Sequence, residues 1–421
     1  MQVLTAQLLL ASSLAQATVA WHEQIPLGGV PEILPVVDKA LSYRDDLVSL
    51  HKSLVDIQSI SFDESEVGQF LVDYLTERDF VVYKQFLPTS NKTASGPSED
   101  DKARFNVVAW PGSRGPRPFP KVLVTSHIDT VPPFIPYLRS DHGRAINGET
   151  VIAGRGSVDA KASVAAQIIA VFELLEAEEI EREDDVMLLF VVGEERSGDG
   201  MRVFSDAVAR RDPPLELRAA IFGEPTEGKL ACGHKGFFDC EITVHGKAGH
   251  SGYPWLGKSA NEVLMRALTK VLDTDLGSSE EYGNTTVNVG LLQGGVAPNV
   301  IPEKATSKIA GRVAIGPQDG GSQIVVDRLI DVLKSVDEEG IEYQCYTGYG
   351  VVKCECDVDG FETAVMNYGT DVANFRGTHT KYLYGPGSIL VAHGPDEALK
   401  LKDMEDAVEG YKKLILHALG N

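Results

Sequence analysis

The stretch KVLVTSHIDTVPP, residues 121–133, decides the fold class. Its apolar residues predict a buried β-strand that ends near His127, because the two prolines that follow cannot continue a strand. Asp129 comes two residues after His127, the spacing that places both side chains on the same side of a strand. The stretch therefore predicts a core strand whose end carries an imidazole and a carboxylate.

Other apolar segments predict the rest of the same sheet. RFNVVAW, DVMLLFVV and LRAAIF are continuous apolar runs, as expected of strands that are buried on both faces. VDAKASVAAQIIAVFELLEAEE predicts a long helix, and SFDE at Ser61–Glu64 resembles a capping box that opens a helix to about Arg78. Alternating strands and helices predict an α/β fold, in which helices cover both faces of a mostly parallel sheet.

The pattern changes near His234. GFFDCEITVHG and TTVNVGLLQGG alternate apolar and polar residues, which predicts a sheet with one solvated face. Helical segments separate these strands, and the α/β pattern returns after Cys354. We therefore expect a smaller α+β domain, residues 235–354, inserted into a discontinuous larger domain formed by residues 21–234 and 355–421.

The first twenty residues resemble a secretory signal. MQVLTAQLLLASSLAQATVA has an apolar core followed by small residues, although no Lys or Arg precedes the core. The apolar run is too short to span a bilayer, so we expect a secreted, extracellular protein. The sequons at Asn91 and Asn284 would then be available for glycosylation.

The net charge limits the binding partners of the chain, and the cysteine count limits its disulfides. The formal net charge of −22 argues against nucleic acid and anionic membranes as partners. Five cysteines in 421 residues are too few for a disulfide scaffold. They allow one disulfide, and their odd number leaves at least one unpaired within a monomer.

Acidic and imidazole side chains recur where the predicted core strands end. Each has an ordinary alternative, such as a helix cap for Asp159, a solvated pair for the two adjacent glutamates or a turn residue for Glu224. Together they lie at one predicted sheet edge, where α/β proteins bind ligands. The residues concerned are His127, Asp129, Asp159, Glu194, Glu195, Glu224 and His393.

Closely packed carboxylates repel one another unless a cation lies between them. Nitrogen and oxygen donors without thiolate suit Zn²⁺, with Co²⁺ or Mn²⁺ as substitutes. Five ligands are too many for one tetrahedral ion. They predict two ions about 3.5 Å apart that share one bridging carboxylate.

Several motifs occur in an order that is typical of one family. They are SHIDTVP, GRGSVDAK, GEERSG, GEPT, HGKAGHSGYP, GGVAPNVIP and YGPGSILVAHGPDE. This series resembles the di-zinc exopeptidase and deacylase family, which includes acetylornithine deacetylase, succinyl-diaminopimelate desuccinylase, aminoacylase and the glutamate-releasing carboxypeptidases. The resemblance covers nearly the whole chain after the signal segment. It implies that the inserted domain is a lid and dimerisation domain.

The resemblance also implies a role for each residue at the predicted metal centre. His127 and Glu224 would be the terminal ligands of one zinc ion, Glu195 and His393 those of the other, and Asp159 the bridge. Asp129 would orient His127. Glu194 would be the general base that takes a proton from a metal-bridging water and passes it to the leaving nitrogen.

The inserted domain and one later turn would contribute the remaining site residues. By resemblance, His250 would stabilise the oxyanion, often from the partner subunit of a homodimer. Arg312 and Asn299 would bind the carboxylate end of the substrate, and an arginine fork suits that task. Gly387, in the GPGS turn, would let the backbone approach the substrate. Without the resemblance, His250 could be a turn residue and Arg312 a surface ion-pair residue.

The sequence departs from the family pattern at two positions. Ala162 follows Lys161 where relatives more often have glycine, and Gly193 precedes Glu194 where many carry an acid. Neither change removes a ligand or the base. The resemblance also makes Asp159–Ala160 a candidate for a cis peptide bond.

Three functions agree with these residues. The first is a secreted zinc carboxypeptidase that hydrolyses an amide bond next to a free carboxylate. The second is a deacylase that uses the same chemistry on N-acyl amino acids, and the third is a binding protein that keeps the scaffold without turnover. Export favours the first, and the intact ligand and base positions count against the third.

Overall fold

The computed structural model of the chain describes residues 41–88, 103–112, 120–141, 145–180 and 185–420. The predicted signal segment and the sequon at Asn91 lie outside these ranges. Within them, each helix is either too short or too polar to cross a membrane.

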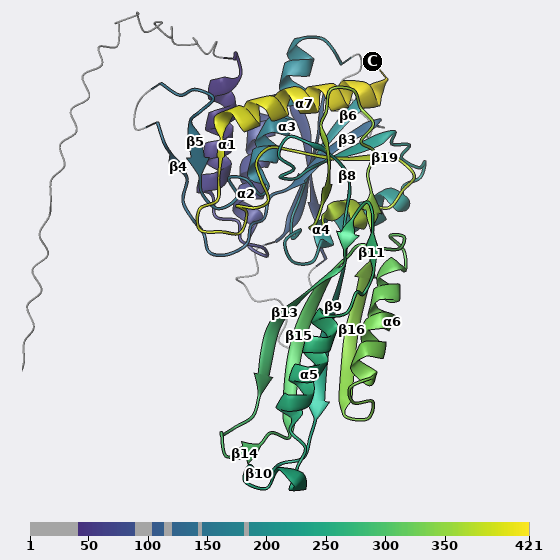
Figure 1. The fold of residues 1–421 in the computed structure, drawn as a ribbon. Helices are drawn as coiled ribbons and strands as arrows, with labels where there is room; N and C mark the ends of the chain where they lie inside the picture. Colours follow the sequence, from purple (N-terminus) through teal and green to yellow (C-terminus); the bar gives the residue numbers. More distant parts are fainter. Residues whose placement is uncertain (1–40, 89–102, 113–119, 142–144, 181–184, 421) are drawn as a thin grey trace, which may run out of the picture. The chain divides into compact units, whose positions relative to one another are not determined.

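A six-stranded sheet forms the larger core (Figure 1). In spatial order its strands are β1 (Phe80–Phe86), β2 (Phe105–Pro111), β6 (Val186–Val191), β3 (Val122–His127), β7 (Ala219–Gly223) and β19 (Thr380–Tyr384). The last four are parallel to one another. At one edge, β2 is antiparallel to both of its neighbours, β1 and β6. The predicted α/β fold with a mainly parallel sheet is thus confirmed.

Successive residues of the central strands face two different cores. Val122 and Val124 of β3 pack in one hydrophobic cluster, and Leu123 packs in another. The helices of the first cluster are α1 (Arg44–Asp56), α2 (Ser65–Thr76), α3 (Lys161–Glu176) and α7 (Leu401–Leu419). Because α3 contacts the sheet, α1 and α7, it is apolar on nearly all sides and almost fully buried.

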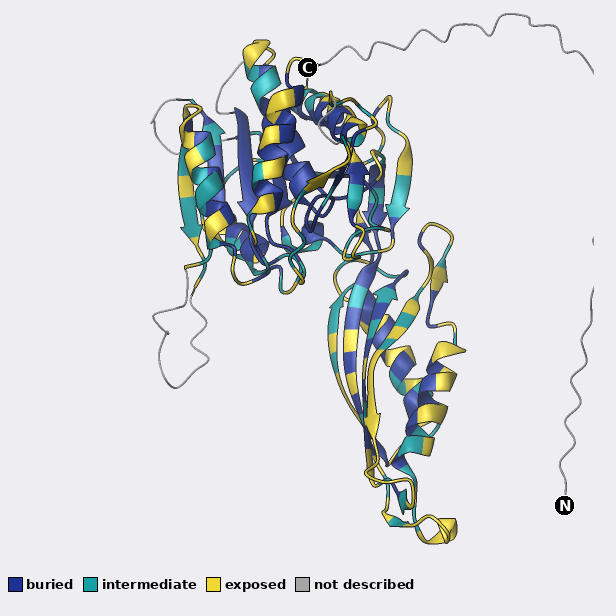
Figure 2. Ribbon diagram, turned by 90° about the vertical axis from the view of Figure 1, so that its left-hand side faces the viewer, coloured by how far each residue is buried: buried dark blue, intermediate teal, exposed yellow. Residues whose placement is uncertain are grey.

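The second face of the sheet is covered by helix and strand together. Met201 and Phe204 of α4 (Asp199–Ala209) pack there with Phe375, which follows the short helix η3 (Asp371–Asn374). A three-stranded sheet completes this cover, formed in order by β17 (Val352–Lys353), β8 (Leu230–His234) and β18 (Thr363–Met366). Figure 2 shows the central strands as the most deeply buried part of the fold.

A second, four-stranded antiparallel sheet lies within residues 235–354. In spatial order its strands are β13 (Thr286–Gly294), β15 (Lys304–Val313), β9 (Gly236–His245) and β16 (Ile341–Tyr349). Helices α5 (Ala260–Leu272) and α6 (Gly321–Lys334) pack against one face, where Phe238 and Ile242 are fully buried. Burial alternates along β9, as the sequence pattern predicts for a sheet with one solvated face (Figure 2). The domain boundaries at 234/235 and 354/355 stay predictions.

Short strands connect parts of the chain that are distant in sequence. A three-stranded sheet has the order β20 (Ala398–Lys400), β5 (Val151–Ala153) and β4 (Leu138–Arg139). Two further pairs are β10 (Gly249–His250) with β14 (Val300–Ile301), and β11 (Ser278–Ser279) with β12 (Gly283–Asn284). The short helix η2 (Pro254–Leu256) follows β10.

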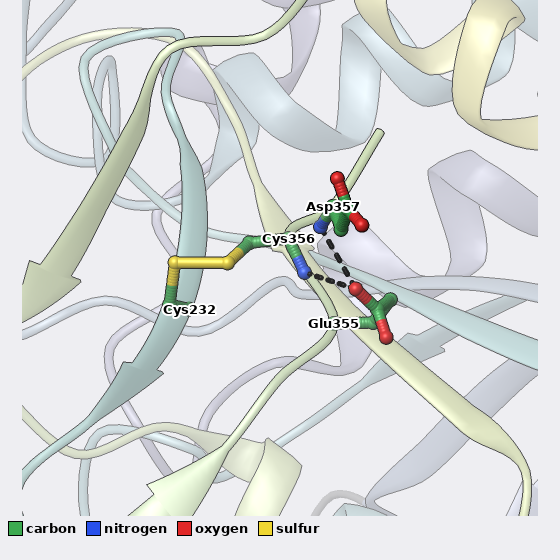
Figure 3. Close-up of a disulfide and its surroundings, with 4 residues drawn as sticks. All are labelled: Cys232, Glu355, Cys356 and Asp357. Carbon is green, nitrogen blue, oxygen red and sulfur yellow. Dashed lines mark hydrogen bonds between the residues drawn. A yellow bond between two sulfur atoms is a disulfide. The ribbon is translucent and has the colours of Figure 1, made fainter. Parts of the chain in front are cut away.

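The structure contains two disulfides, one more than the single bridge considered from the sequence. Cys240 and Cys345 face each other across β9 and β16 and are bonded. Cys232 of β8 is bonded to Cys356, and Cys354 is free. Figure 3 shows the second bridge beside Glu355, whose carboxylate accepts the backbone N–H groups of residues 356 and 357 at 2.9 and 2.8 Å. The register that brings each pair together cannot be read from cysteine spacing.

The predicted capping box at Ser61–Glu64 is wrong. Helix α2 begins at Ser65, and Glu64 stands at its N-cap without a side-chain capping bond. The Ser61 hydroxyl donates instead to Asp129 Oδ2 at 2.7 Å. A long-range contact has therefore taken the hydroxyl that a local cap would use.

Candidate active site

Three neighbouring parallel strands bring four of the predicted residues to one edge of the sheet. His127 is the last residue of β3 and lies opposite Val191, the last residue of β6. Glu194 and Glu195 follow just beyond Val191, and Glu224 comes directly after β7. Because parallel strands end at the same edge, these side chains converge, as the sequence pattern predicts.

The other two predicted ligands come from loops at the small sheet formed by β20, β5 and β4. Asp159 lies in the loop after β5, and His393 lies in the loop before β20. These two strands pair antiparallel, with Ala153 opposite Ala398, so the two loops leave the same end of the pair. The peptide bond between Asp159 and Ala160 is cis, as the resemblance predicted.

The six-stranded sheet and the small sheet together assemble two groups of possible metal donors. In each group the donor atoms lie within 4.8 Å of one another. The first consists of His127, Asp159 and Glu224, and the second of Asp159, Glu195 and His393. Asp159 belongs to both, because its Oδ1 lies 3.0 Å from His127 Nε2 and its Oδ2 lies 3.2 Å from His393 Nε2. All five predicted ligands therefore meet, with Asp159 in the bridging place.

Both donor groups suit a divalent metal ion. They offer imidazole nitrogen and carboxylate oxygen, with no thiolate, and each combines one imidazole with two carboxylates. Burial alone would raise the pKa of Asp159, but the hydrogen bonds from the two imidazoles hold it below its ordinary value. Burial raises the pKa of Glu224 well above its ordinary range. A cation between these groups would relieve both the burial and the repulsion.

Asp129 links His127, a predicted metal ligand, to the loop with the predicted base. His127 Nδ1 lies 3.0 Å from the backbone oxygen of Asp129 and 3.6 Å from its carboxylate Oδ1. The carboxylate accepts the backbone N–H groups of Glu194 at 3.1 Å and Glu195 at 3.3 Å. The sequence predicted the contact with His127 but not this second one, which joins the ends of β3 and β6.

Glu194 adjoins both donor groups and belongs to neither. Burial raises the pKa of its carboxyl well above the ordinary value, and the nearby Glu224 raises it further. His127 acts in the opposite direction. A carboxyl whose proton affinity is raised in this way suits a general base or acid, as predicted for Glu194.

The donor groups open into a cavity of about 480 Å³, a usual size for a small-ligand site. Arg312 of β15 lines it, and its guanidinium carbon lies 5.4 Å from the ring centre of Phe237 on the adjacent strand. Arg312 forms no ion pair with any residue of the described ranges. Its charge is therefore available to an anion in the cavity.

Of the described residues, His250, Asn299 and Gly387 were also predicted at the site, but they are not part of the lining of this cavity. His250 and Asn299 are both exposed and lie together at the strand pair β10 and β14, where Ser251 N donates to Asn299 O at 3.1 Å. Gly387 has a φ of 75° and packs against Val158, next to Asp159. The structure thus brings His250 and Asn299 to each other, and their roles at a catalytic site stay predictions.

Some cavity residues carry no recognisable sequence signal. Tyr349 and Tyr368 line the cavity, and the Tyr368 hydroxyl donates to Pro225 O at 3.0 Å, directly after Glu224. Asp371 is buried nearby with its Oδ1 accepting from Asn374 at 2.7 Å, and burial raises its pKa to about 6. Tyr349 is the last residue of β16, Tyr368 follows β18, and Asp371 is the first residue of η3. Hydrophobic periodicity does not predict that these three residues come together near the site.

Known proteins share the sequence over most of its length. Residues 232–339 match the family model described as a peptidase dimerisation domain. A peptidase M20 domain-containing protein of Sordaria macrospora is 57% identical over 91% of this chain and 87% of its own length. A probable carboxypeptidase of Aspergillus fumigatus is 42% identical over 100% of this chain and 99% of its own.

Solved structures share the fold at much lower identity. A tripeptidase from Staphylococcus aureus superimposes with a TM-score of 0.68 at 20% identity, over 89% of this chain and 99% of that one. An M20 family metallo-carboxypeptidase from Sulfolobus solfataricus gives a TM-score of 0.65 at 16% identity, with the same coverage. At such identities the likeness supports the fold, and the site must be argued from its own residues.

Proposed function

This chain belongs to the M20 peptidase family, and we propose that it is a secreted, zinc-dependent carboxypeptidase. It would hydrolyse the amide bond next to a free carboxylate. The observation that carries this proposal is the pair of donor groups that share Asp159, in a cavity that also contains the unpaired guanidinium of Arg312. The name of the relative from Aspergillus fumigatus, a probable carboxypeptidase, supports it.

Zinc is the proposed metal because the donors are nitrogen and oxygen atoms, and Co²⁺ and Mn²⁺ are expected substitutes. His127 and Glu224 would hold one ion and Glu195 and His393 the other, with Asp159 between them. When bound, the two ions would supply Lewis acidity, which polarises a carbonyl group and makes water more acidic.

Residues of this chain would complete the reaction. Glu194 would take the proton of the attacking water and return it to the leaving nitrogen, a role supported by its place beside both donor groups without belonging to either. Asp129 holds the backbone of this glutamate and the ring of His127 together. His250 would reach the oxyanion only from a second copy of the chain, since it lies apart from the cavity of its own chain.

A homodimer through the second sheet agrees with the matched dimerisation domain. Strand β13 is an edge strand of that sheet, and its Leu291 and Leu292 are more than half exposed. Unpaired edges of this kind readily pair with another chain. Sedimentation at micromolar concentration should give twice the monomer mass, and a monomer would contradict the dimer.

Secretion agrees with the two disulfides, since such bonds persist mainly in oxidising compartments. Asn284 is exposed at the end of β12, as a glycosylated residue must be. The intact mass of protein collected from the medium tests both points. A mass that includes residues 1–20 would contradict the signal, and one without glycan would contradict the glycosylation.

The function is tested with the purified chain, zinc and three substrate classes. N-blocked dipeptides with a free C-terminus should be hydrolysed, and the same peptides with a C-terminal amide should not. Faster turnover of N-acetyl amino acids would identify the deacylase instead. Turnover of none of them by a chain with zinc bound would leave only a binding function.

The Arg312→Gln variant is expected to lose about 10–100-fold in kcat/KM on blocked dipeptides, because a hydrogen bond to a charged group contributes about 1.5–3 kcal/mol. The loss should appear mainly in KM and should be absent for any residual turnover of amidated peptides. Arg266→Gln is the matched control, since Arg266 is an exposed arginine of α5 that pairs with Glu262. Equal losses on free and amidated peptides would contradict carboxylate binding by Arg312.

A further inference from the structure

Two charged residues of the quoted motifs have no part in the mechanism described so far. Arg155 lies in GRGSVDAK, and Glu397 lies in HGPDE. They form an ion pair at 2.6 Å between Arg155 Nη1 and Glu397 Oε2. Both side chains are almost completely buried, at 2% and 1% exposure. A buried ion pair is costly unless its remaining hydrogen-bonding groups are also satisfied, so its other partners indicate its purpose.

The partners of Glu397 lie in the loop that carries Asp159. Its Oε1 accepts the backbone N–H groups of Val158 at 3.0 Å and Asp159 at 3.1 Å. Its backbone oxygen accepts from Gly154 N at 3.1 Å and from the Ser157 hydroxyl at 3.2 Å. A single residue therefore holds both ends of the loop between β5 and the shared donor.

Besides Glu397, the Arg155 side chain has one partner in the loop that carries His393 and one in the segment after β3. Its Nη2 donates to His393 O at 3.1 Å, and its Nε donates to Pro133 O at 3.3 Å. His393 has a φ of 64°, a conformation that is rare for residues other than glycine. Its ring is about half exposed, so little packing holds it in place. The hydrogen bond from Arg155 restrains the backbone that carries this ring, while the ring itself contacts Asp159 and Glu195.

Electrostatics around the pair are consistent with this arrangement. An ionised Glu397 is an acceptor on all its lone pairs, which is what the two N–H groups and the guanidinium require.

We propose that Glu397, held by Arg155, is a positioning residue that fixes Asp159 and His393 relative to each other. The pair would set the separation of Asp159 and His393 within the second donor group, whose third member is Glu195. Strands β5 and β20 bring the two loops to the same place, and the ion pair locks them at the separation that a metal ion needs. Outer residues of this kind typically change metal affinity or activity by about 10–100-fold. The inference rests on the metal centre of the proposed function.

The test compares two buried ion pairs. Glu397→Gln keeps the shape and one acceptor oxygen but removes the charge that pairs with Arg155. The matched control is Glu405→Gln, because Glu405 of α7 forms another buried pair, with Arg44 at 2.5 Å, whose side chains are 7% and 5% exposed, and belongs to neither donor group. Cobalt binding is measured by competition with a chelator, together with the visible spectrum of bound Co²⁺. Urea unfolding of both variants reports their stability.

Glu397→Gln is expected to weaken cobalt binding by about 10–100-fold and to alter the cobalt spectrum, while Glu405→Gln binds within about twofold of the unaltered chain. Unaltered affinity and spectrum in Glu397→Gln would overturn the inference. Equal weakening in both variants would also overturn it, because any buried ion pair would then have the same effect.

A second variant covers the case in which Glu397→Gln does not fold. Arg155→Lys keeps the charge but cannot reach Glu397, His393 and Pro133 together, so it too should weaken cobalt binding by at least about tenfold. Unchanged binding by Arg155→Lys would overturn the inference. If the unaltered chain itself binds no cobalt, the metal centre of the proposed function is wrong, which is a result distinct from normal binding by the variants.

Discussion

Replacing Glu194 by glutamine is expected to lower kcat by about 10²–10⁴-fold while the chain keeps its full metal content, because the change removes a general base without removing a donor. The structure motivates this separation. Glu194 and Glu195 are adjacent, yet only Glu195 belongs to a donor group. Burial and Glu224 raise the pKa of Glu194, as suits a group that accepts a proton.

The adjacent Glu195 gives the most direct comparison for the Glu194→Gln prediction. Glu195→Gln should lose metal from the second donor group as well as activity, whereas Glu194→Gln should lose activity alone. Glu227→Gln is the control for neutralising a carboxylate near the site, since Glu227 is exposed and pairs with Lys229. Steady-state kinetics and elemental analysis of dialysed protein give both readouts. Turnover retained by Glu194→Gln would refute its role as the base.

Asp159→Asn is expected to remove both metal ions, because Asp159 is the donor that the two groups share. Loss of a direct ligand should exceed the roughly 10–100-fold fall in affinity that outer partners cause. Asparagine keeps the size of the side chain and one oxygen, but it loses the charge and the second oxygen that faces His393. Activity on blocked dipeptides should fall with metal content.

The Glu224→Gln variant tests whether Glu224 binds one metal ion while Asp159 binds two. Glu224 belongs only to the first donor group, so this variant should keep one ion where Asp159→Asn keeps none. Isothermal titration of zinc into the chelator-treated proteins measures the number of sites directly. Two sites of unaltered affinity in Asp159→Asn would show that Asp159 bridges nothing.

The strand-end residues could be predicted from sequence because parallel strands end together. The apolar run before His127 predicts β3, and similar runs place Glu194, Glu195 and Glu224 at the ends of β6 and β7. No such pattern places Asp159 and His393. Their meeting depends on β5 and β20, strands of three residues each, which are too short to give a periodic signal. Asp159 and His393 were expected at the same sheet edge as the other residues, and the motif resemblance implied their roles as ligands.

Long-range side-chain contacts were the least predictable features. The Ser61 hydroxyl could equally cap a helix or donate to Asp129, and only the packed fold distinguishes the two. The same holds for the cysteines, whose pairing follows the register of β9 with β16 and the path of the chain after β17. The cavity position of Arg312 requires strands of the second sheet to meet the ends of the first, which hydrophobic periodicity does not describe.

The bridge between Cys232 and Cys356 has a consequence for the survival of the molecule in a protease-rich medium. It joins the chain just before and just after the segment that forms the second sheet. A cut in an exposed turn of that segment, for example between β11 and β12, would leave two polypeptides that stay covalently attached. Such a nicked molecule would migrate as one species on a non-reducing gel and separate only after reduction, so backbone cleavage there need not release either piece.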